Sequence, residues 1–225
     1  MLPAAERFID GYGDRFAAAV RVCIVGNIMD FGHGIALDSP EGFPEMFEEL
    51  LEEGIGSDDT EALKKLVEDS DTVLYAFDNC GESVLDRLLI REIRAMGKRV
   101  VGVVRGEPIL NDVTREDAER IDVGCDRLVS TGAFAIGFPE RISDAGLQEE
   151  MGRAGVIIAK GMANYESLSE RDPGIPVAFL LRAKCAPIAH SLGVGLNTNV
   201  VRVLPAGGRS GMLPFGTDTN RVRIR

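Results

Sequence analysis

The sequence predicts an α/β protein with a doubly wound, mainly parallel β-sheet of the Rossmann-like, three-layer kind, preceded by an N-terminal helical segment. Two patterns carry this prediction. Beyond residue 70, short apolar runs alternate with stretches of helical pattern, which is typical of strands that helices bury on both faces. Before residue 70 the patterns are helical. With 225 residues, 45% of them hydrophobic, the chain can bury a full core.

The N-terminal segment, residues 1–70, contains three expected helices. Residues 16–25 combine good helix formers with an apolar face, and residues 43–53 and 60–68 follow as acidic amphipathic helices. Side chains just before residue 60 can cap the last of them. Residues 41–71 hold twelve acidic residues and two lysines. This imbalance favours a solvated face on the two acidic helices.

The remaining chain alternates between expected strands and helices. Apolar runs predict strands at residues 72–77, 99–104, 127–130, 156–159, 177–181 and 200–204. Helical patterns lie between them at residues 82–96, 115–121, 145–153, 165–170 and 186–191. We therefore expect a catalytic α/β domain over residues 71–204, followed by a flexible Gly-rich tail over residues 205–225.

Charge and composition exclude several classes of protein. A net charge of −11 argues against non-specific nucleic-acid binding. No apolar run reaches the roughly 18–20 residues of a membrane helix, and charged residues interrupt the N-terminus, so neither a membrane span nor a signal peptide is expected. The four cysteines form no C-x-x-C pair, and there are two histidines. A reduced, cytoplasmic protein without a zinc knuckle is therefore expected.

Polar residues follow three of the predicted strands. Asp78 and Asn79 come directly after residues 72–77, Asp112 follows residues 99–104 after a short loop, and Lys160 follows residues 156–159. In a doubly wound sheet, ligands bind at the carboxyl ends of the strands. A simpler alternative is that Asp78, Asn79 and Asp112 merely cap the helices that follow them.

This set of residues suits metal-assisted phosphoryl chemistry. Two carboxylates and an amide oxygen are oxygen ligands of the kind that Mg²⁺ or Mn²⁺ takes, and Co²⁺ or Ni²⁺ cannot be ranked against them from ligand type. A nearby lysine can neutralise a phosphate. Helix N-termini near Glu82 and Asn164 would add backbone N–H donors toward an anion.

The sequence resembles the DUF89 family, the metal-dependent damage-control phosphatases, and most of all its archaeal-type members. Five segments carry the resemblance, in family order: Gly26-Asn27-Ile28-Met29-Asp30-Phe31-Gly32, Asp78-Asn79-Cys80-Gly81-Glu82 with Asp86, Asn111-Asp112-Val113-Thr114 with Asp117, Lys160-Gly161-Met162-Ala163-Asn164-Tyr165-Glu166, and Lys184-Cys185-Ala186-Pro187-Ile188-Ala189 with Leu192-Gly193-Val194. Family members usually carry a larger N-terminal helical domain than the 70 residues present here.

The resemblance implies that Asp78, Asn79 and Asp112 hold the catalytic divalent metal. It also implies phosphate binding by Lys160 and polar site roles for Glu82, Asn27 and Asp30. Other interpretations of the residues stay open. Lys160 could be a surface lysine, Glu82 with Asp86 could be an ordinary helix face, and Asp30 could be a helix cap.

We therefore expect a metal-dependent phosphatase that hydrolyses phosphate monoesters of small metabolites, such as sugar phosphates, phosphopantetheine-like compounds or damaged cofactor phosphates. The nucleophile could be a water molecule or an aspartate, and the oligomeric state is open. One alternative is a metal- and ligand-binding protein without catalysis. Another is an S-adenosylmethionine-dependent carboxyl methyltransferase, although no G-x-G-x-x-G loop follows any strand.

Overall fold

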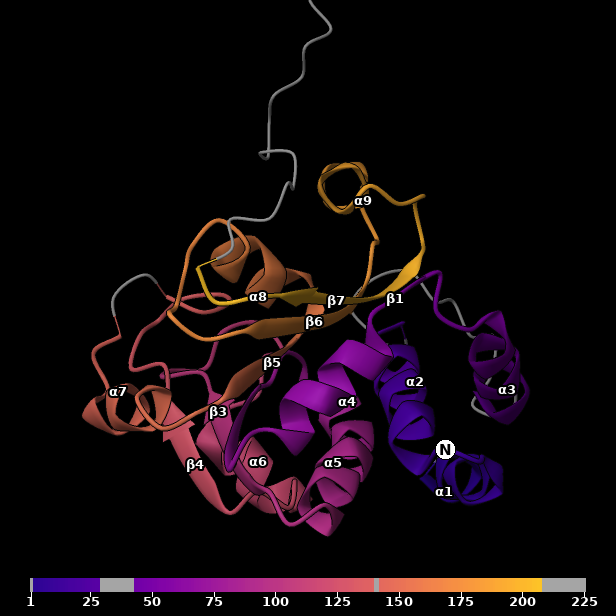
Figure 1. Cartoon of the computed structure of the whole chain (residues 1–225), viewed down its shortest axis with the longest axis horizontal. Helices are drawn as coiled ribbons and strands as arrows, with labels where there is room; N and C mark the ends of the chain where they lie inside the picture. Colours follow the sequence, from indigo (N-terminus) through magenta and orange to yellow (C-terminus); the bar gives the residue numbers. More distant parts are fainter. Residues whose placement is uncertain (1, 29–42, 140–141, 208–225) are drawn as a thin grey trace, which may run out of the picture.

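The alternating apolar runs and helices fold into a seven-stranded sheet with helices on both faces (Figure 1). A computed structural model describes residues 2–28, 43–139 and 142–207, with backbone alone for residues 43–45. The predicted α/β class and the N-terminal helices are confirmed. None of the helices in these ranges is long and apolar enough to cross a membrane.

The elements lie close to their predicted positions. The strands are β1 (Ser57–Asp58), β2 (Thr72–Ala76), β3 (Arg99–Val104), β4 (Arg127–Ser130), β5 (Val156–Lys160), β6 (Val177–Arg182) and β7 (Asn199–Leu204). The helices are α1 (Leu2–Gly11), α2 (Arg15–Ile28), α3 (Phe43–Glu53), α4 (Thr60–Glu68), α5 (Cys80–Ala95), α6 (Arg115–Ile121), α7 (Ala145–Met151), α8 (Gly161–Leu168) and α9 (Ala186–Leu192). The sequence patterns did not single out α1 and β1.

The strands run in the order β1-β7-β6-β5-β2-β3-β4, so the chain reverses its direction of travel across the sheet between β2 and β5. From β2 the chain adds β3 and β4 on one side, and β5 and β6 later extend the other side. All neighbouring pairs are parallel except β6 with β7, which is antiparallel. The β2–β5 boundary is the switch point at which doubly wound sheets bind ligands.

Two hydrophobic cores cover the two faces of the sheet. Val73 and Tyr75 of β2 pack into the core that also holds α2 and α5, whereas Leu74 and Ala76 pack into the core beneath α7, α8 and α9. Each strand alternates its side chains between faces, and both faces are apolar. This explains why the strands appear as unbroken apolar runs in the sequence.

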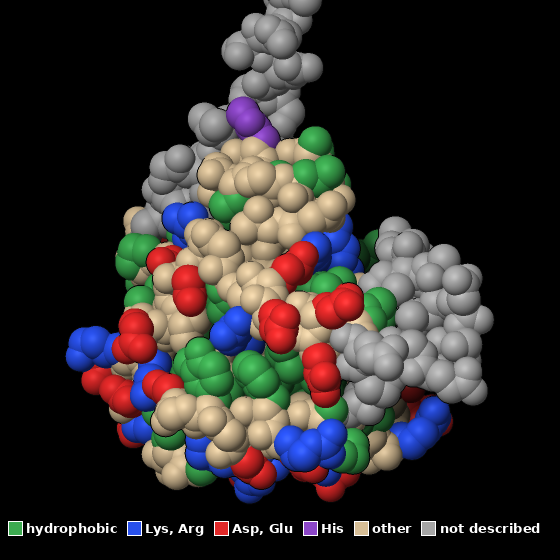
Figure 2. Space-filling model, turned by 90° about the vertical axis from the view of Figure 1, so that its right-hand side faces the viewer, with side chains coloured by type: hydrophobic (Ala, Val, Ile, Leu, Met, Phe, Trp, Pro, Cys, Tyr) green, Lys and Arg blue, Asp and Glu red, His purple; other side chains and the backbone are tan. Residues whose placement is uncertain are grey.

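The acidic side chains of α3 and α4 are solvated, as their pattern predicts. From Glu48 to Asp71, all the acidic residues are exposed except Asp59, which is half-buried. The opposite faces of these helices bury Phe47, Leu63 and Val67. Figure 2 shows the side of the molecule nearest α1 and α3, where acidic and basic side chains are interspersed around small hydrophobic patches.

The N-terminal segment packs against the α/β sheet. Helix α2 packs on α5 and on β6, and β1 pairs in parallel with β7 through Ser57 and Asp58. The predicted division at residue 70 remains a prediction. Most of the predicted flexible tail, residues 208–225, and the candidate residue Asp30 lie outside the described residues.

Candidate functional site

Backbone pairing brings the loops after β2 and β3 together. The Cys80 N–H donates to the Asn111 carbonyl at 2.9 Å, and the Val113 N–H donates to the Asp78 carbonyl at 2.8 Å. These bonds form an isolated antiparallel bridge that sets Asn79 opposite Asp112. Residues separated by more than thirty positions in the sequence therefore meet at the carboxyl edge of the sheet.

A cavity of about 630 Å³ opens at this edge. Four of the predicted site residues line it: Asn27, Asp78, Asn79 and Asp112. Its size lies within the range of small-molecule sites, which is roughly 300–1,000 Å³. The structure thus gathers four of the eight predicted residues around one cavity and places Glu82, Lys160 and Asn164 in the protein interior nearby.

An arginine that the sequence analysis did not consider joins the two aspartates. Arg105 Nε donates to Asp112 Oδ2 at 2.5 Å, and its Nη2 lies 3.5 Å from Asp78 Oδ1. Its Nη1 donates to Asn164 Oδ1 at 3.3 Å. The guanidinium is buried and does not line the cavity. Arg105 directly follows β3, so the strand-end rule that singled out Asp78 also applied to it.

Asn79 and Glu82 are held by the start of α5. Asn79 precedes the helix, and its backbone N–H donates to Glu82 Oε1 at 3.1 Å. Its side-chain amide donates to Asp78 Oδ2 at 3.3 Å, and Asn79 lines the cavity. The expected capping role and the expected site role of Asn79 are therefore compatible. Glu82 is enclosed and acts here on the backbone of Asn79.

Lys160 lies in the protein interior, so the alternative of a surface lysine is wrong. It is fully enclosed, and its Nζ lies 3.1 Å from Glu82 Oε2, 2.9 Å from Asp86 Oδ1 and 3.3 Å from the Cys23 carbonyl. Glu82 and Asp86 are likewise buried, which excludes the ordinary solvated helix face for this pair. Lys160 does not line the cavity.

The buried ionisable groups carry more negative than positive charge. When all four are ionised, Asp78, Asp112, Glu82 and Asp86 exceed the positive charges of Arg105 and Lys160, their partners among the described residues, by two. Burial, and then the negative charge of Glu82, raise the pKa of Asp78 well above its usual range, against the effect of Arg105. Burial raises the pKa of Asp86 to about 6, although Lys160 opposes the shift.

This donor set fits a divalent cation. Asp78, Asn79 and Asp112 line the cavity and carry carboxylate and amide oxygens, and a charge of +2 would balance the two excess negative charges. Among the described residues, no group of three or more His, Cys, Asp or Glu side chains is arranged to hold a metal. A cation bound here would therefore use two carboxylates and an amide, and water or substrate would complete its coordination.

Asn164 and Gly161 fix the geometry behind the carboxylates. The sequence pattern placed the start of this helix near Asn164. Helix α8 begins at Gly161 instead, so Asn164 lies within its first turn. The Asn164 amide instead donates to the Phe77 and Lys160 carbonyls at 3.0 and 2.7 Å, which ties the end of β2 to the end of β5. Gly161 has φ of +72°, and a Cβ atom there would collide with Asp78 Oδ2.

Two cations line the cavity on the side of β6. Arg182 donates to Glu53 Oε2 at 2.5 Å, and its backbone N–H donates to Asn27 Oδ1 at 3.3 Å. Lys184 Nζ donates to the Asn27 carbonyl at 2.5 Å. Asn27 thus joins the end of α2 to the end of β6. Lys184 stands in a segment that carries the family resemblance, and that segment was the signal for its place in the site.

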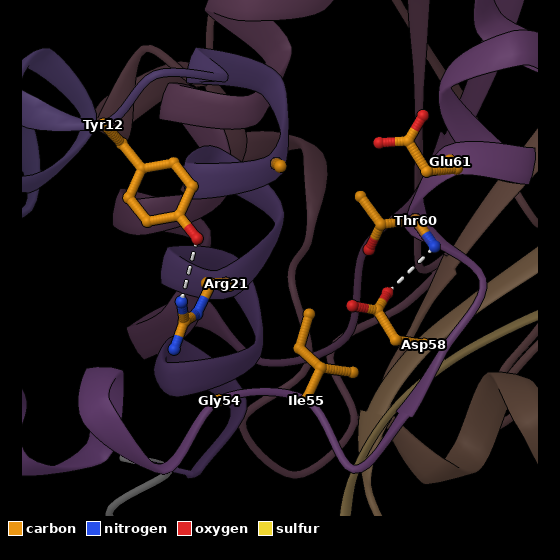
Figure 3. A pocket seen from close by; sticks show the side chains of 8 residues that line it. Tyr12, Arg21, Gly54, Ile55, Asp58, Thr60 and Glu61 are labelled. Atoms are coloured by element: carbon orange, nitrogen blue, oxygen red, sulfur yellow. Dashed lines mark hydrogen bonds between the residues drawn. The ribbon is translucent and has the colours of Figure 1, made fainter.

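A second cavity, of about 250 Å³, lies among α2, β1 and α4 (Figure 3). Arg21 forms one wall and donates to the Tyr12 hydroxyl at 3.2 Å, while Asp58, Thr60 and Glu61 form the opposite wall. Asp58 accepts from the Thr60 backbone N–H at 2.9 Å. None of the predicted site residues lines this cavity. The carboxylate-lined cavity at the switch point is therefore the candidate site.

Comparison with known proteins agrees with this fold. The model of the damage-control phosphatase ARMT1-like domain matches residues 2–200. The chain belongs to this family. The DUF89 resemblance of its five sequence segments is thereby confirmed.

Its relatives in the family include archaeal proteins of greater length. A damage-control phosphatase of Archaeoglobus fulgidus is 40% identical over 207 residues, which cover 91% of this chain and 70% of that protein. A damage-control phosphatase of Pyrococcus horikoshii is 38% identical over 80% of this chain and 62% of its own length. The crystal structure of a DUF89 family protein from Pyrococcus horikoshii matches with a TM-score of 0.77 and 34% identity, over 88% of this chain and 69% of that one. The chain thus spans about two thirds of the length of its curated relatives.

Proposed function

We propose that the chain is a metal-dependent phosphatase that hydrolyses phosphate monoesters of small metabolites. The observation that carries this proposal is the meeting of Asp78, Asn79 and Asp112 at one cavity, with two excess negative charges buried behind them. The names of two relatives as damage-control phosphatases support the reaction class.

The roles of the three residues follow from their positions. Asp78, Asn79 and Asp112 would hold the divalent cation with their oxygen atoms. When bound, the cation would polarise the phosphoryl group and offset its charge. Arg105 occupies one oxygen of Asp112, and the other oxygen accepts no hydrogen bond from the described residues. Asp112 therefore has an oxygen available at the cavity.

The positive charge for the substrate phosphate would come from two sides. Lys184 lines the cavity and uses one of its three N–H groups on the Asn27 carbonyl, which leaves donors for a phosphate oxygen. Lys160, which the resemblance implies as a phosphate ligand, lies behind the wall among Glu82 and Asp86. At that position its charge favours the ionised form of Asp78. We therefore assign phosphate contact to Lys184 and electrostatic support to Lys160.

The cavity wall indicates the kind of ester. Ile28, Ile136 and Met162 line it together with the polar residues. Leu110, which is 83% exposed, stands among the lining residues as well. A phosphate group at the carboxylates would leave its organic part against these apolar side chains. This arrangement supports small organic phosphates as the substrate class.

The test is a hydrolysis screen of the purified chain. Sugar phosphates, phosphopantetheine and cofactor phosphates are each assayed for phosphate release with Mg²⁺, Mn²⁺, Co²⁺ or Ni²⁺, and with EDTA. We expect release from at least one ester with metal and none with EDTA. Glu116→Ala, at an exposed residue of α6, is the control variant and should release phosphate at the wild-type rate. Absence of release from every ester with every metal would overturn the proposal.

A further inference from the structure

Arg105 is enclosed and contacts three residues of the candidate site. Its exposed fraction is 2%. The guanidinium reaches Asp112 at 2.5 Å, Asn164 at 3.3 Å and Asp78 at 3.5 Å. Its own backbone N–H donates to the Val113 carbonyl at 2.9 Å, so the loop of residues 105–113 closes on itself and places Arg105 beside Asp112.

Arg105 contacts both carboxylates without lining the cavity. Asp78 and Asp112 line the cavity, whereas Arg105 does not. Each carboxylate gives one named oxygen to the guanidinium, Oδ1 of Asp78 and Oδ2 of Asp112. The second oxygen of Asp112 is left without a hydrogen-bond donor among the described residues. A planar guanidinium presents its donors to two carboxylates at fixed angles, whereas a lysine ammonium acts as a point charge.

Two buried carboxylates that share one guanidinium repel each other when both are ionised, and burial strengthens the repulsion. Arg105 offsets one of the two charges and leaves the pair with a net charge of −1. It also fixes the rotation of both carboxyl groups. Groups that orient metal ligands in this way typically change metal affinity 10- to 100-fold when they are removed.

We propose that Arg105 is a positioning residue. It holds Asp78 and Asp112 together through one guanidinium, so that both carboxylates stay at the cavity where a divalent cation would bind. The proposal rests on the proposed function, because it takes these two residues as the metal ligands. It assigns to Arg105 no contact with substrate.

The test measures Mn²⁺ binding directly, by isothermal titration of EDTA-treated protein. Arg105→Met should weaken the binding of Mn²⁺ by a factor of about 10 to 100. Arg105→Lys keeps a buried cation but loses the two-point contact, so its affinity should lie between those of Arg105→Met and the wild type. If Arg105→Met is not recovered as folded protein, the Mn²⁺ affinity of Arg105→Lys is compared with that of the wild type instead.

The control is Arg99→Met, at the opposite end of the same strand. Arg99 binds the buried Glu150 at 2.6 Å, so its loss should lower the melting temperature while Mn²⁺ affinity stays within about twofold of the wild type. Unchanged or tighter Mn²⁺ binding by folded Arg105 variants would overturn the positioning role alone. A wild-type chain that does not bind Mn²⁺ would overturn the proposed function together with it.

Discussion

Asp78 occupies a position that its neighbours determine closely. Its backbone carbonyl accepts from Val113, its Oδ1 faces Arg105, and its Oδ2 accepts from Asn79 and lies against Gly161. Gly161 is needed there for two reasons. Its φ of +72° is in the left-handed region, and a Cβ atom would occupy the space of Asp78 Oδ2.

Gly161→Ala should therefore lower the free energy of unfolding by more than backbone strain alone would. The left-handed conformation alone costs an alanine about 1–2 kcal/mol. Displacement of Asp78 should add to this cost and should weaken Mn²⁺ binding. The matched control is Gly193→Ala, at φ of +69° with no atom within 4 Å of the added Cβ, which should show the backbone strain only. Urea unfolding and Mn²⁺ titration of both variants test this prediction. Equal losses of unfolding free energy and equal Mn²⁺ affinities in the two variants would contradict it.

At the residue scale, the sequence predicts which polar groups lie at the cavity better than it predicts their contacts. Asp78, Asn79 and Asp112 were expected together because they follow neighbouring strands, and they do line one cavity. The enclosure of Lys160 between Glu82 and Asp86 could not be foreseen, because it depends on how α2 and α5 pack together beside the end of β5. The burial of Arg105 could not be foreseen either, because it depends on how residues 105–113 fold back beside Asp112.

At the element scale, α7 is attached to the sheet by a buried carboxylate. Glu150 is fully enclosed and accepts from Arg99 Nη1 at 2.6 Å and Nη2 at 2.8 Å, and from Arg127 Nη1 at 2.6 Å. Arg99 begins β3 and Arg127 begins β4, so one side chain of α7 links two strands. The hydrogen bonds from Arg99, with those from Arg127, lower the pKa of Glu150 to about 2 against the effect of burial.

The stability of the protein should therefore depend on pH through Glu150. The folded-state pKa of about 2 lies below the ordinary value of 4.5, so its contribution is present above pH 4.5 and is lost as pH falls toward 2. Glu150→Gln should lower the free energy of unfolding by roughly 3 kcal/mol at pH 7, and by less as pH falls from 5 to 3. Glu149→Gln, at a half-exposed neighbour on α7, should have little effect at any pH. Urea unfolding of the wild type and the variants across this pH range tests the prediction. A difference in unfolding free energy between the wild type and Glu150→Gln that stays constant with pH would contradict it.

Strands that form apolar runs were predictable from the sequence, including the edge strand β4, whereas the short edge strand β1 was not. Strands β2, β3 and β5 are buried on both faces and therefore appear as apolar runs. Strand β1 has two residues, too few for any periodicity. The antiparallel direction of β7 follows from how the chain returns after α9, and the apolar run at residues 200–204 is compatible with either direction.

At the scale of the whole molecule, topology and charge converge on one edge of the sheet. The strand order changes direction between β2 and β5, and the loops after β2 and β3 are joined there by backbone hydrogen bonds. The acidic residues of the chain fall into two groups, one solvated and one buried. The acidic residues of α3 and α4 are solvated, whereas Asp78, Asp112, Glu82 and Asp86 form a buried excess of negative charge that a divalent cation would offset.

The most direct test of this account is a Mn²⁺ titration of p-nitrophenyl phosphate hydrolysis by metal-depleted protein, with wild type and Asp112→Ala in parallel. Wild-type hydrolysis should rise with Mn²⁺ and saturate. Asp112→Ala, with unchanged circular dichroism, should lose at least about 100-fold of that rate because an oxygen ligand and its charge are gone. Near-wild-type, Mn²⁺-dependent turnover by folded Asp112→Ala would contradict the account.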